Sequence, residues 1–238
     1  MSLKKLFFKT KTTYKIYLYY NLYIRHKGYL KRKQYSQWGE DKFIVEFFKE
    51  KKNGVYLDIG CFNPFMYSNT CLLYKKGWSG INIDINPTSI DLFNIARPRD
   101  INLCTTINNK KKIFKIYQDD PFSPVNTLNE KFFKDLEIKF NKNNKILSVE
   151  SKSIDEVMKI CQTKKNIDFI NIDVEGSDYQ VLTQIKLDQL KPKLISIETH
   201  NPDGSESENC PNIQEFLKKN NFIIYKRVGP TTLFNFSG

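Results

Sequence analysis

The chain has 238 residues, 40% of them hydrophobic and 27% charged, so it is long enough to bury a core and does not resemble a disordered chain. Its net charge of +12 is concentrated in residues 1–35, which carry eight Lys and two Arg without an acid; the rest, with 28 basic and 26 acidic residues, contributes only +2. The charge of residues 36–238 therefore does not indicate a nucleic-acid-binding domain. The five Cys show no C-x-x-C spacing, which argues against a zinc or disulfide framework and favours a reducing compartment.

The basic N-terminal arm, residues 1–35, also contains seven of the 13 Tyr. Its longest uncharged run covers only residues 16–24, whereas a membrane span needs roughly 20 apolar residues. No secretory cleavage site follows, so we expect a cytoplasmic protein. Three uses of the arm remain open: a helix packed against the domain, attraction to the inner membrane surface, or contact with nucleic acid.

Residues 36–238 read as one α/β domain, because short Val- and Ile-rich runs alternate with helical stretches. Strands are expected at residues 55–59, 80–85, 101–107, 168–174 and 194–199, followed by a hairpin of residues 222–227 and 232–236. Helices are expected at residues 68–76, 87–96, 179–185 and 213–220. Residues 108–166 form an insertion with strands at 112–118 and 145–152 and a helix at 153–161, which a Ser153/Glu156 capping box begins.

Carboxylates follow the first two expected strands, at the sheet edge where ligands of parallel sheets bind. Gly60 permits close approach of a ligand, and Asp58 can accept hydrogen bonds from the loop or from a ligand amino group. Asp84 lies 24 residues beyond Gly60, the spacing of a carboxylate that accepts ribose hydroxyls. The intervening turn carries Phe62 and Pro64 in place of a G-x-G-x-x-G cradle. A nucleoside cofactor without pyrophosphate, such as S-adenosylmethionine, fits this pattern.

Five segments in this order resemble the FkbM-like methyltransferases, from about Tyr35 to the C-terminus: SQWGED at 36–41, GVYLDIG at 54–60, SNT at 68–70, GWSGINID at 77–84 and IDFINIDVEG at 167–176. The resemblance implies a Rossmann-like class I methyltransferase sandwich, with a mostly parallel seven-stranded sheet that ends in an antiparallel hairpin. It also implies S-adenosylmethionine as methyl donor and O-methylation of a sugar or natural-product hydroxyl.

Carried over by position, the resemblance places the cofactor ribose at Asp84. It places the methionine part near a set of residues at the first strand and the loop after it, namely Asp58, Gly60, Ser68, Asn69 and Thr70. Gln37 and Glu40 are implied to close over the site. Cys61 replaces a common Ala, and Ile85 replaces the Pro of an Asp-Pro-Asn-Pro sequence, so the adenine pocket beside Ile85 is expected to differ in shape.

The fourth expected strand ends in Asp173 and Glu175, which point the same way on an extended chain. One is a candidate base for a hydroxyl acceptor and the other orients cofactor or hydroxyl; alternatively, Glu175 caps the next helix and Asp173 binds loop amides. His200, after the fifth strand, is a further candidate base or a structural histidine. We expect no metal, although Asp173, Glu175 and His200 together could hold Mg²⁺ or Mn²⁺.

Two other functions compete with O-methylation of a carbohydrate or small molecule. A nucleic-acid methyltransferase would agree with the basic arm, but the Asp-Val-Glu-Gly sequence at 173–176 replaces the Asn/Asp-Pro-Pro-aromatic motif that grips a flipped base. A non-catalytic, membrane-associated adaptor would keep the fold without turnover. The carboxylates Asp58, Asp84 and Asp173 argue against the adaptor.

Overall fold

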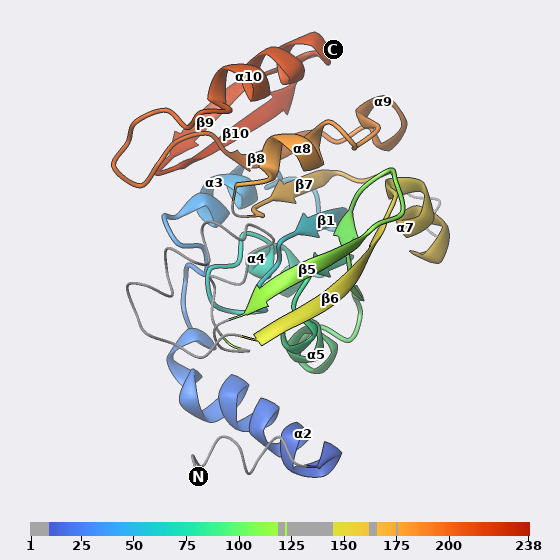
Figure 1. The fold of residues 1–238 in the computed structure, drawn as a ribbon. Coiled ribbons are helices and arrows are strands. Elements are labelled where there is room, and N and C mark those ends of the chain that lie inside the picture. Colours follow the sequence, from blue (N-terminus) through green and yellow to red (C-terminus); the bar gives the residue numbers. More distant parts are fainter. Residues whose placement is uncertain (1–9, 119–121, 123–144, 162–165, 175) are drawn as a thin grey trace.

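The computed structural model describes residues 10–118, 122, 145–161, 166–174 and 176–238. Its centre is a seven-stranded sheet of order β3-β2-β1-β7-β8-β10-β9 (Figure 1). The strands are β1 (Val55–Ile59), β2 (Ser79–Asp84), β3 (Ile101–Cys104), β7 (Phe169–Ile172), β8 (Leu194–Glu198), β9 (Phe222–Val228) and β10 (Thr231–Phe236). The first five are parallel and β10 is antiparallel to both its neighbours. The expected Rossmann-like fold with a C-terminal hairpin is confirmed.

Alternation along the strands gives each face of the sheet its own core. Leu57 and Ile59 of β1 face the larger core, which is covered by α7 (Ile154–Cys161), α8 (Asp178–Leu182), α9 (Leu187–Leu190) and α10 (Cys210–Lys219). Tyr56 faces the opposite, more aromatic core, which α3 (Glu40–Phe47) and α4 (Cys71–Lys75) cover. The strand order reverses between β1 and β7, so the topological switch point of the sheet lies beside the end of β1.

Several expected bounds need correction. The strand at 55–59 and the helix at 87–96, α5 (Pro87–Ala96), are confirmed, whereas the helix expected from residue 68 begins only at Cys71. The strand expected at 101–107 is split into β3 and β4 (Thr106–Ile107). The break is at Thr105, whose N donates to Asp84 O at 3.0 Å and whose Oγ1 donates to Glu150 O at 2.6 Å. Both bonds satisfy polar groups that periodicity cannot anticipate.

The insertion builds a separate three-stranded sheet of order β4-β6-β5, from β5 (Ile113–Gln118) and β6 (Lys145–Lys152) in addition to β4. The capping box before α7 is confirmed, since Glu156 N donates to Ser153 Oγ at 3.2 Å and Ser153 N to the Glu156 carboxylate at 2.7 Å. The insertion therefore forms its own hydrogen-bonded unit, which β4 connects to the end of β3 through Thr105.

The arm forms α2 (Lys11–Tyr20), a π-helical turn η1 (Asn21–Arg25) and a 3₁₀ turn η2 (Lys27–Tyr29). Leu18 and Leu22 are buried against Leu92 of α5, and Tyr14 donates a hydrogen bond to Asp91 at 2.9 Å. One face of the arm is thus packed on the domain. No helix among the described residues is long and apolar enough to cross a bilayer.

Candidate active site

Four buried polar side chains lie side by side on neighbouring strands, on one face of the sheet and close to the carboxyl ends of the strands. The parallel register places Asp58 beside Asn82 on β2 and Asn171 on β7, and Asn171 beside Ser196 on β8. All four are at most 4% exposed. Polar groups are costly to bury without hydrogen bonds. Asn82 donates to Asp100 and Asn102 at 2.9 and 2.8 Å, whereas Asp58 and Asn171 bond to the loop after β1.

That loop is the Ser68–Thr70 segment, and Asp58 holds it in place. Thr70 Oγ1 donates to Asp58 Oδ2 at 2.6 Å, and Asn171 Nδ2 donates to Asp58 Oδ1 at 2.9 Å. Asn69 Nδ2 in turn donates to Asn171 Oδ1 at 2.9 Å. Burial raises the pKa of Asp58, while the bonds from Thr70 and Asn171 and the charge of Arg97 oppose that shift. Of the two partners considered for Asp58, loop and ligand, its hydrogen bonds in the structure go to the loop and to β7.

Arg97, at the end of α5, is the site residue that sequence reasoning missed. Its guanidinium is fully buried and donates to Thr70 Oγ1 at 2.8 Å and Ser68 Oγ at 2.7 Å. The same group lies 4.7 Å from the centre of the Phe93 ring. Burial favours a lower pKa of Arg97, but the neighbouring Tyr56, Cys71, Asp100 and Asp58 together raise it. The loop after β1 is therefore held between a buried carboxylate and a buried cation.

Asp84 ends β2 with its carboxylate already oriented by backbone donors. Phe62 N donates to Asp84 Oδ2 at 2.8 Å, and Asn86 N donates to Oδ1 at 2.7 Å. Burial raises the pKa of Asp84 to about 6, against the opposing effect of these two bonds. Each oxygen keeps a further lone pair for a ligand hydroxyl. Ile85, the next residue, is half-buried and its carbonyl accepts a hydrogen bond from Cys104 Sγ at 3.5 Å.

Position 60 requires a glycine because the backbone that follows β7 lies too close for a side chain. Its φ is +84°, and a β-carbon there would lie 1.7 Å from the carbonyl oxygen of Asp173. Asp173 N continues the ladder of β7 by donating to Ile59 O at 2.9 Å. The close approach that Gly60 allows in the structure is thus between the ends of β1 and β7.

Asp173 is half-buried and directly follows β7. Because its backbone continues the ladder, alternation places it on the same side of the sheet as Asn171 and Asp58. Glu175, its expected partner, lies outside the described residues. The amide of Val174 is bound by Asp178, whose Oδ1 accepts it at 3.1 Å, so this loop amide is satisfied from within α8.

His200 belongs to a different group of side chains. Its Nδ1 is 2.8 Å from Thr199 Oγ1, and its nearest acidic and thiol neighbours are Glu206 and Cys210, with one ligand-type atom of each of the three within 4.8 Å of the others. Burial and the charge of Arg227 lower the pKa of His200, against the effect of Glu206. Asp173 is not a member of this cluster, so the structure does not bring these two candidate bases into one metal-ligand group.

Gln37 and Glu40, the residues implied to close over the site, differ in setting. Gln37 is exposed. Glu40 is 3% exposed and accepts hydrogen bonds from Trp38 N at 2.9 Å and from Thr231 Oγ1 at 3.1 Å. Thr231 pairs in register with Glu198, the last residue of β8. Glu40 therefore ties the segment before β1 to the carboxyl end of β8.

Comparison with known families agrees with this arrangement. A search of curated proteins gives no match to the chain. A family model described as the methyltransferase FkbM domain matches residues 58–224. The matched region begins at Asp58 and includes every strand of the central sheet from β2 to β8. This match covers more than half of the 238 residues. The chain belongs to the FkbM family of methyltransferases.

Proposed function

We propose that this methyltransferase uses S-adenosylmethionine to methylate a hydroxyl group of a sugar, a glycan or another small molecule. The observation that supports the donor most directly is Asp84, a carboxylate beside the switch point that two backbone amides hold for a ligand. The neighbouring turn offers Phe62 and Pro64 where a dinucleotide would need a pyrophosphate cradle. A ribose without pyrophosphate fits these residues.

In this proposal Asp84 accepts hydrogen bonds from the two ribose hydroxyls. The loop that borders the methionine part consists of Ser68, Asn69 and Thr70. Asp58 and Arg97 act as positioning residues, because their hydrogen bonds to Thr70 and Ser68 hold this loop in place. When bound, the cofactor supplies an electrophilic methyl group on a sulfonium. The protein then has to align the acceptor oxygen and exclude water, which is where positioning accelerates such transfers.

A hydroxyl acceptor loses its proton as the new bond forms, and Asp173 is the described carboxylate that we assign as base. Asp173→Asn is expected to lower kcat on the order of 10²–10⁴-fold and leave affinity for S-adenosylmethionine nearly unchanged. Methyl incorporation from labelled cofactor into a panel of glycans and small hydroxyl compounds measures the rate. Asp188→Asn, an exposed carboxylate on α9, is the control and should keep full activity. Equal rates in both variants would remove Asp173 from the base role.

The raised pKa of Asp84 predicts a pH dependence of cofactor binding. A carboxylate with a pKa of about 6 is ionised at pH 7 and becomes protonated as the pH falls. Since ribose hydroxyls donate to the ionised form, affinity should be full at pH 7 and fall by up to about tenfold per pH unit below 6. Calorimetric titration between pH 5 and 7 measures this. Asp84→Asn should bind weakly at every pH without that slope, and a flat wild-type profile would contradict the assignment.

We also propose a cytoplasmic location. All five cysteines are free in the structure, as expected where cellular reductants keep thiols reduced. Alkylation of the protein in intact cells with a membrane-permeant thiol reagent should label Cys104, the exposed cysteine. If Cys104 were recovered in its oxidised form and without label, the protein would have to reside in another compartment.

A further inference from the structure

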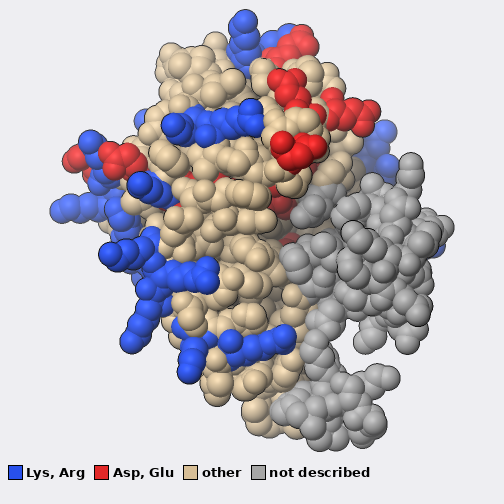
Figure 2. All heavy atoms as spheres, turned by 90° about the vertical axis from the view of Figure 1, so that its left-hand side faces the viewer, with Lys and Arg blue, Asp and Glu red and all other residues tan. Residues whose placement is uncertain are grey.

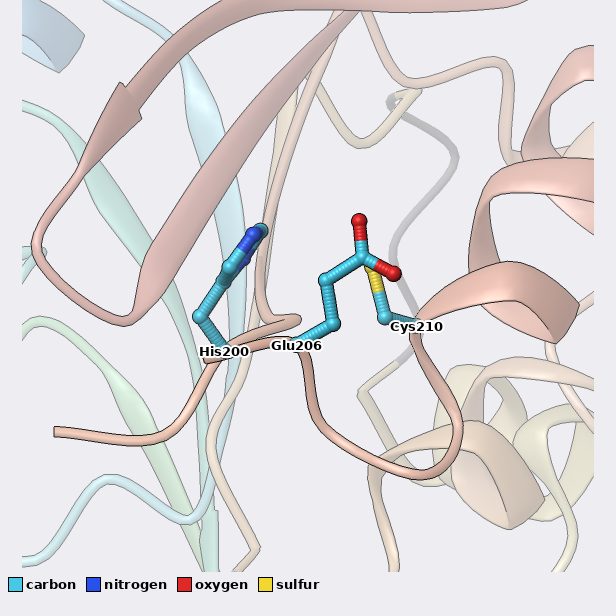
Figure 3. A group of neighbouring side chains, drawn as sticks. All are labelled: His200, Glu206 and Cys210. Carbon is cyan, nitrogen blue, oxygen red and sulfur yellow. The ribbon is translucent and has the colours of Figure 1, made fainter. Parts of the chain in front are cut away.

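Three side chains of different chemistry converge beside the end of β8. His200 follows that strand, Glu206 lies on the loop after it and Cys210 begins α10 (Figure 3). Their ligand-type atoms lie within 4.8 Å of one another. His200 and Glu206 are also joined by an antiparallel backbone bridge, and Ser207 N donates to Thr199 O at 2.9 Å. The three side chains are thus carried by a loop that its own backbone bonds define.

Side chains around the cluster orient two of the three groups. Thr199 Oγ1 lies 2.8 Å from His200 Nδ1 and 2.6 Å from Thr232 Oγ1, so with Nδ1 as donor the ring keeps Nε2 as a lone-pair nitrogen. A hydrogen bond on the nitrogen that does not bind the metal is the usual support of a metal-binding imidazole. Gln214 Nε2 donates to Cys210 Sγ at 3.2 Å, which stabilises the thiolate, whereas burial and the charge of Glu206 raise the pKa of Cys210. A bound cation would therefore have to displace the thiol proton.

We propose that His200, Glu206 and Cys210 bind a Zn²⁺ ion, with water as the fourth ligand. Imidazole nitrogen, carboxylate oxygen and thiolate sulfur are the ligand types of Zn²⁺, and the thiolate disfavours Mg²⁺ and Ca²⁺. The carboxylate and the thiolate balance the charge of the ion, and the thiol proton leaves to solvent on binding. Exposed Glu206 leaves the cluster open to entry from solvent. The ion would fasten the loop after β8 to the start of α10, beside the edge that carries the candidate active site.

Zinc titration of the full chain against a chromophoric chelator tests this site. Wild-type protein should bind one equivalent, and Glu206→Gln and His200→Gln should each weaken binding by about 100-fold or more. Cys104→Ser, which removes an exposed thiol elsewhere, should bind as wild type does. With Co²⁺ in place of Zn²⁺, a sulfur-to-metal charge-transfer band should appear and be absent in Cys210→Ser.

Cys210 is fully buried, so circular dichroism must accompany its variant, whereas Glu206 is exposed and its Gln variant should fold normally. Binding of less than one equivalent by folded wild-type protein would overturn the proposal. Equal affinity in Glu206→Gln, His200→Gln and wild type would overturn it as well. None of these measurements depends on methyl transfer, so they stand apart from the proposed function.

A second, independent feature is an exposed apolar stripe on the arm. Five large side chains spaced three and four residues apart lie on the face of α2 and η1 opposite to Leu18 and Leu22: Ile16, Tyr19, Tyr20, Tyr23 and Ile24, with exposed fractions of 56, 46, 44, 39 and 61%. This spacing places them on one side of a helix, so the arm has a second apolar face in addition to the one on the domain. Tyr23 also meets Phe65 edge-on, with 6.5 Å between the ring centres.

Four basic residues of the same segment are exposed, namely Lys11, Lys15, Arg25 and Lys27. None of the ion pairs between described residues involves them. On the face shown in Figure 2, Lys and Arg side chains spread over the middle and lower parts, while Asp and Glu gather toward the top. A helical segment with Tyr and Ile on one face and exposed cations along it suits the interface of an anionic bilayer.

We infer that the arm docks on an anionic lipid surface through this stripe. Co-sedimentation with vesicles of phosphatidylcholine, with and without phosphatidylserine, should show binding only to the anionic vesicles and release by high salt. The double variant Ile16→Ser/Ile24→Ser should reduce binding by about tenfold or more. Ile223→Ser/Ile224→Ser, which removes two equally exposed side chains from β9, is the matched control.

Equal binding by the two double variants would overturn this inference. A concentration-dependent dimer in analytical ultracentrifugation that disappears in Ile16→Ser/Ile24→Ser would overturn it too, because the stripe would then be a contact between two copies of the chain.

Discussion

Replacement of Arg97 with Met is expected to lower the free energy of unfolding by about 3–5 kcal/mol, because removing one member of a buried charge network leaves the other uncompensated. Arg97 is fully buried and binds Ser68 and Thr70, and its charge opposes the rise that burial causes in the pKa of Asp58. Without it the loop after β1 loses its support from α5. Urea denaturation measures the stability, and calorimetry should show weakened binding of S-adenosylmethionine by the folded fraction.

Arg99→Met is the matched control, two residues further along the chain. Both guanidinium groups lie over the Tyr74 ring, at 5.6 Å from its centre for Arg97 and 4.2 Å for Arg99. Arg99 donates a hydrogen bond to Tyr74 O at 2.7 Å, but this bond lies at an exposed position. Its loss should change stability by about 1 kcal/mol or less. Equal stability of the Arg97 and Arg99 variants would show that the buried network does not hold the loop.

Gly60→Ala is expected to destabilise the protein by about 4 kcal/mol or more, since no small movement relieves a backbone collision of this size. The added β-carbon would lie 1.7 Å from Asp173 O, so the ends of β1 and β7 would have to separate. The bond from Asp173 N to Ile59 O would break with them. Thermal denaturation measures the effect, and hydrogen exchange should localise it to these two strand ends.

Gly176→Ala separates the collision from the cost of the backbone angle. Gly176 has the same φ of +84°, yet nothing lies within 4 Å of a β-carbon there. Its Ala variant should therefore lose only about 1 kcal/mol, the cost of a left-handed Ala. If both variants lost the same small amount, the contact between the strand ends would not be the reason for glycine at position 60.

Hydrophobic periodicity was sufficient to predict the sheet and most of its helices, because each strand of the centre is a short apolar run bounded by a turn. The positions of Asp58 and Asp84 at neighbouring strand ends also followed from the sequence, since parallel strands end at one edge. The predicted bounds of helices and strands were wrong where side-chain hydrogen bonds hold the chain in place of the backbone bonds of a regular element. The clearest example is Ser68–Thr70, where Arg97 and Asp58 bind hydroxyls that a helix would have carried outward.

The residues that complete the site depend on contacts far apart in the chain. Arg97 stands 27 residues after Thr70 and is followed by Pro98, so in the sequence it looks like an exposed residue at the end of a helix. Glu40 reaches Thr231 across 191 positions. The nearness of His200, Glu206 and Cys210 likewise depends on the path of one loop, which no spacing rule for zinc sites describes. Only the tertiary structure brings such pairs together.

The central claim is that S-adenosylmethionine binds at the carboxyl edge with its ribose on Asp84. Isothermal titration of S-adenosylmethionine into the wild-type chain and into Asp84→Ala at pH 7.5 tests it most directly. The wild-type chain should bind one equivalent, and Asp84→Ala, with an unchanged circular dichroism spectrum, should bind roughly 100-fold more weakly, because two hydrogen bonds to a charged acceptor are lost. Equal affinity of the two proteins, or no binding by the wild-type chain, would contradict the claim.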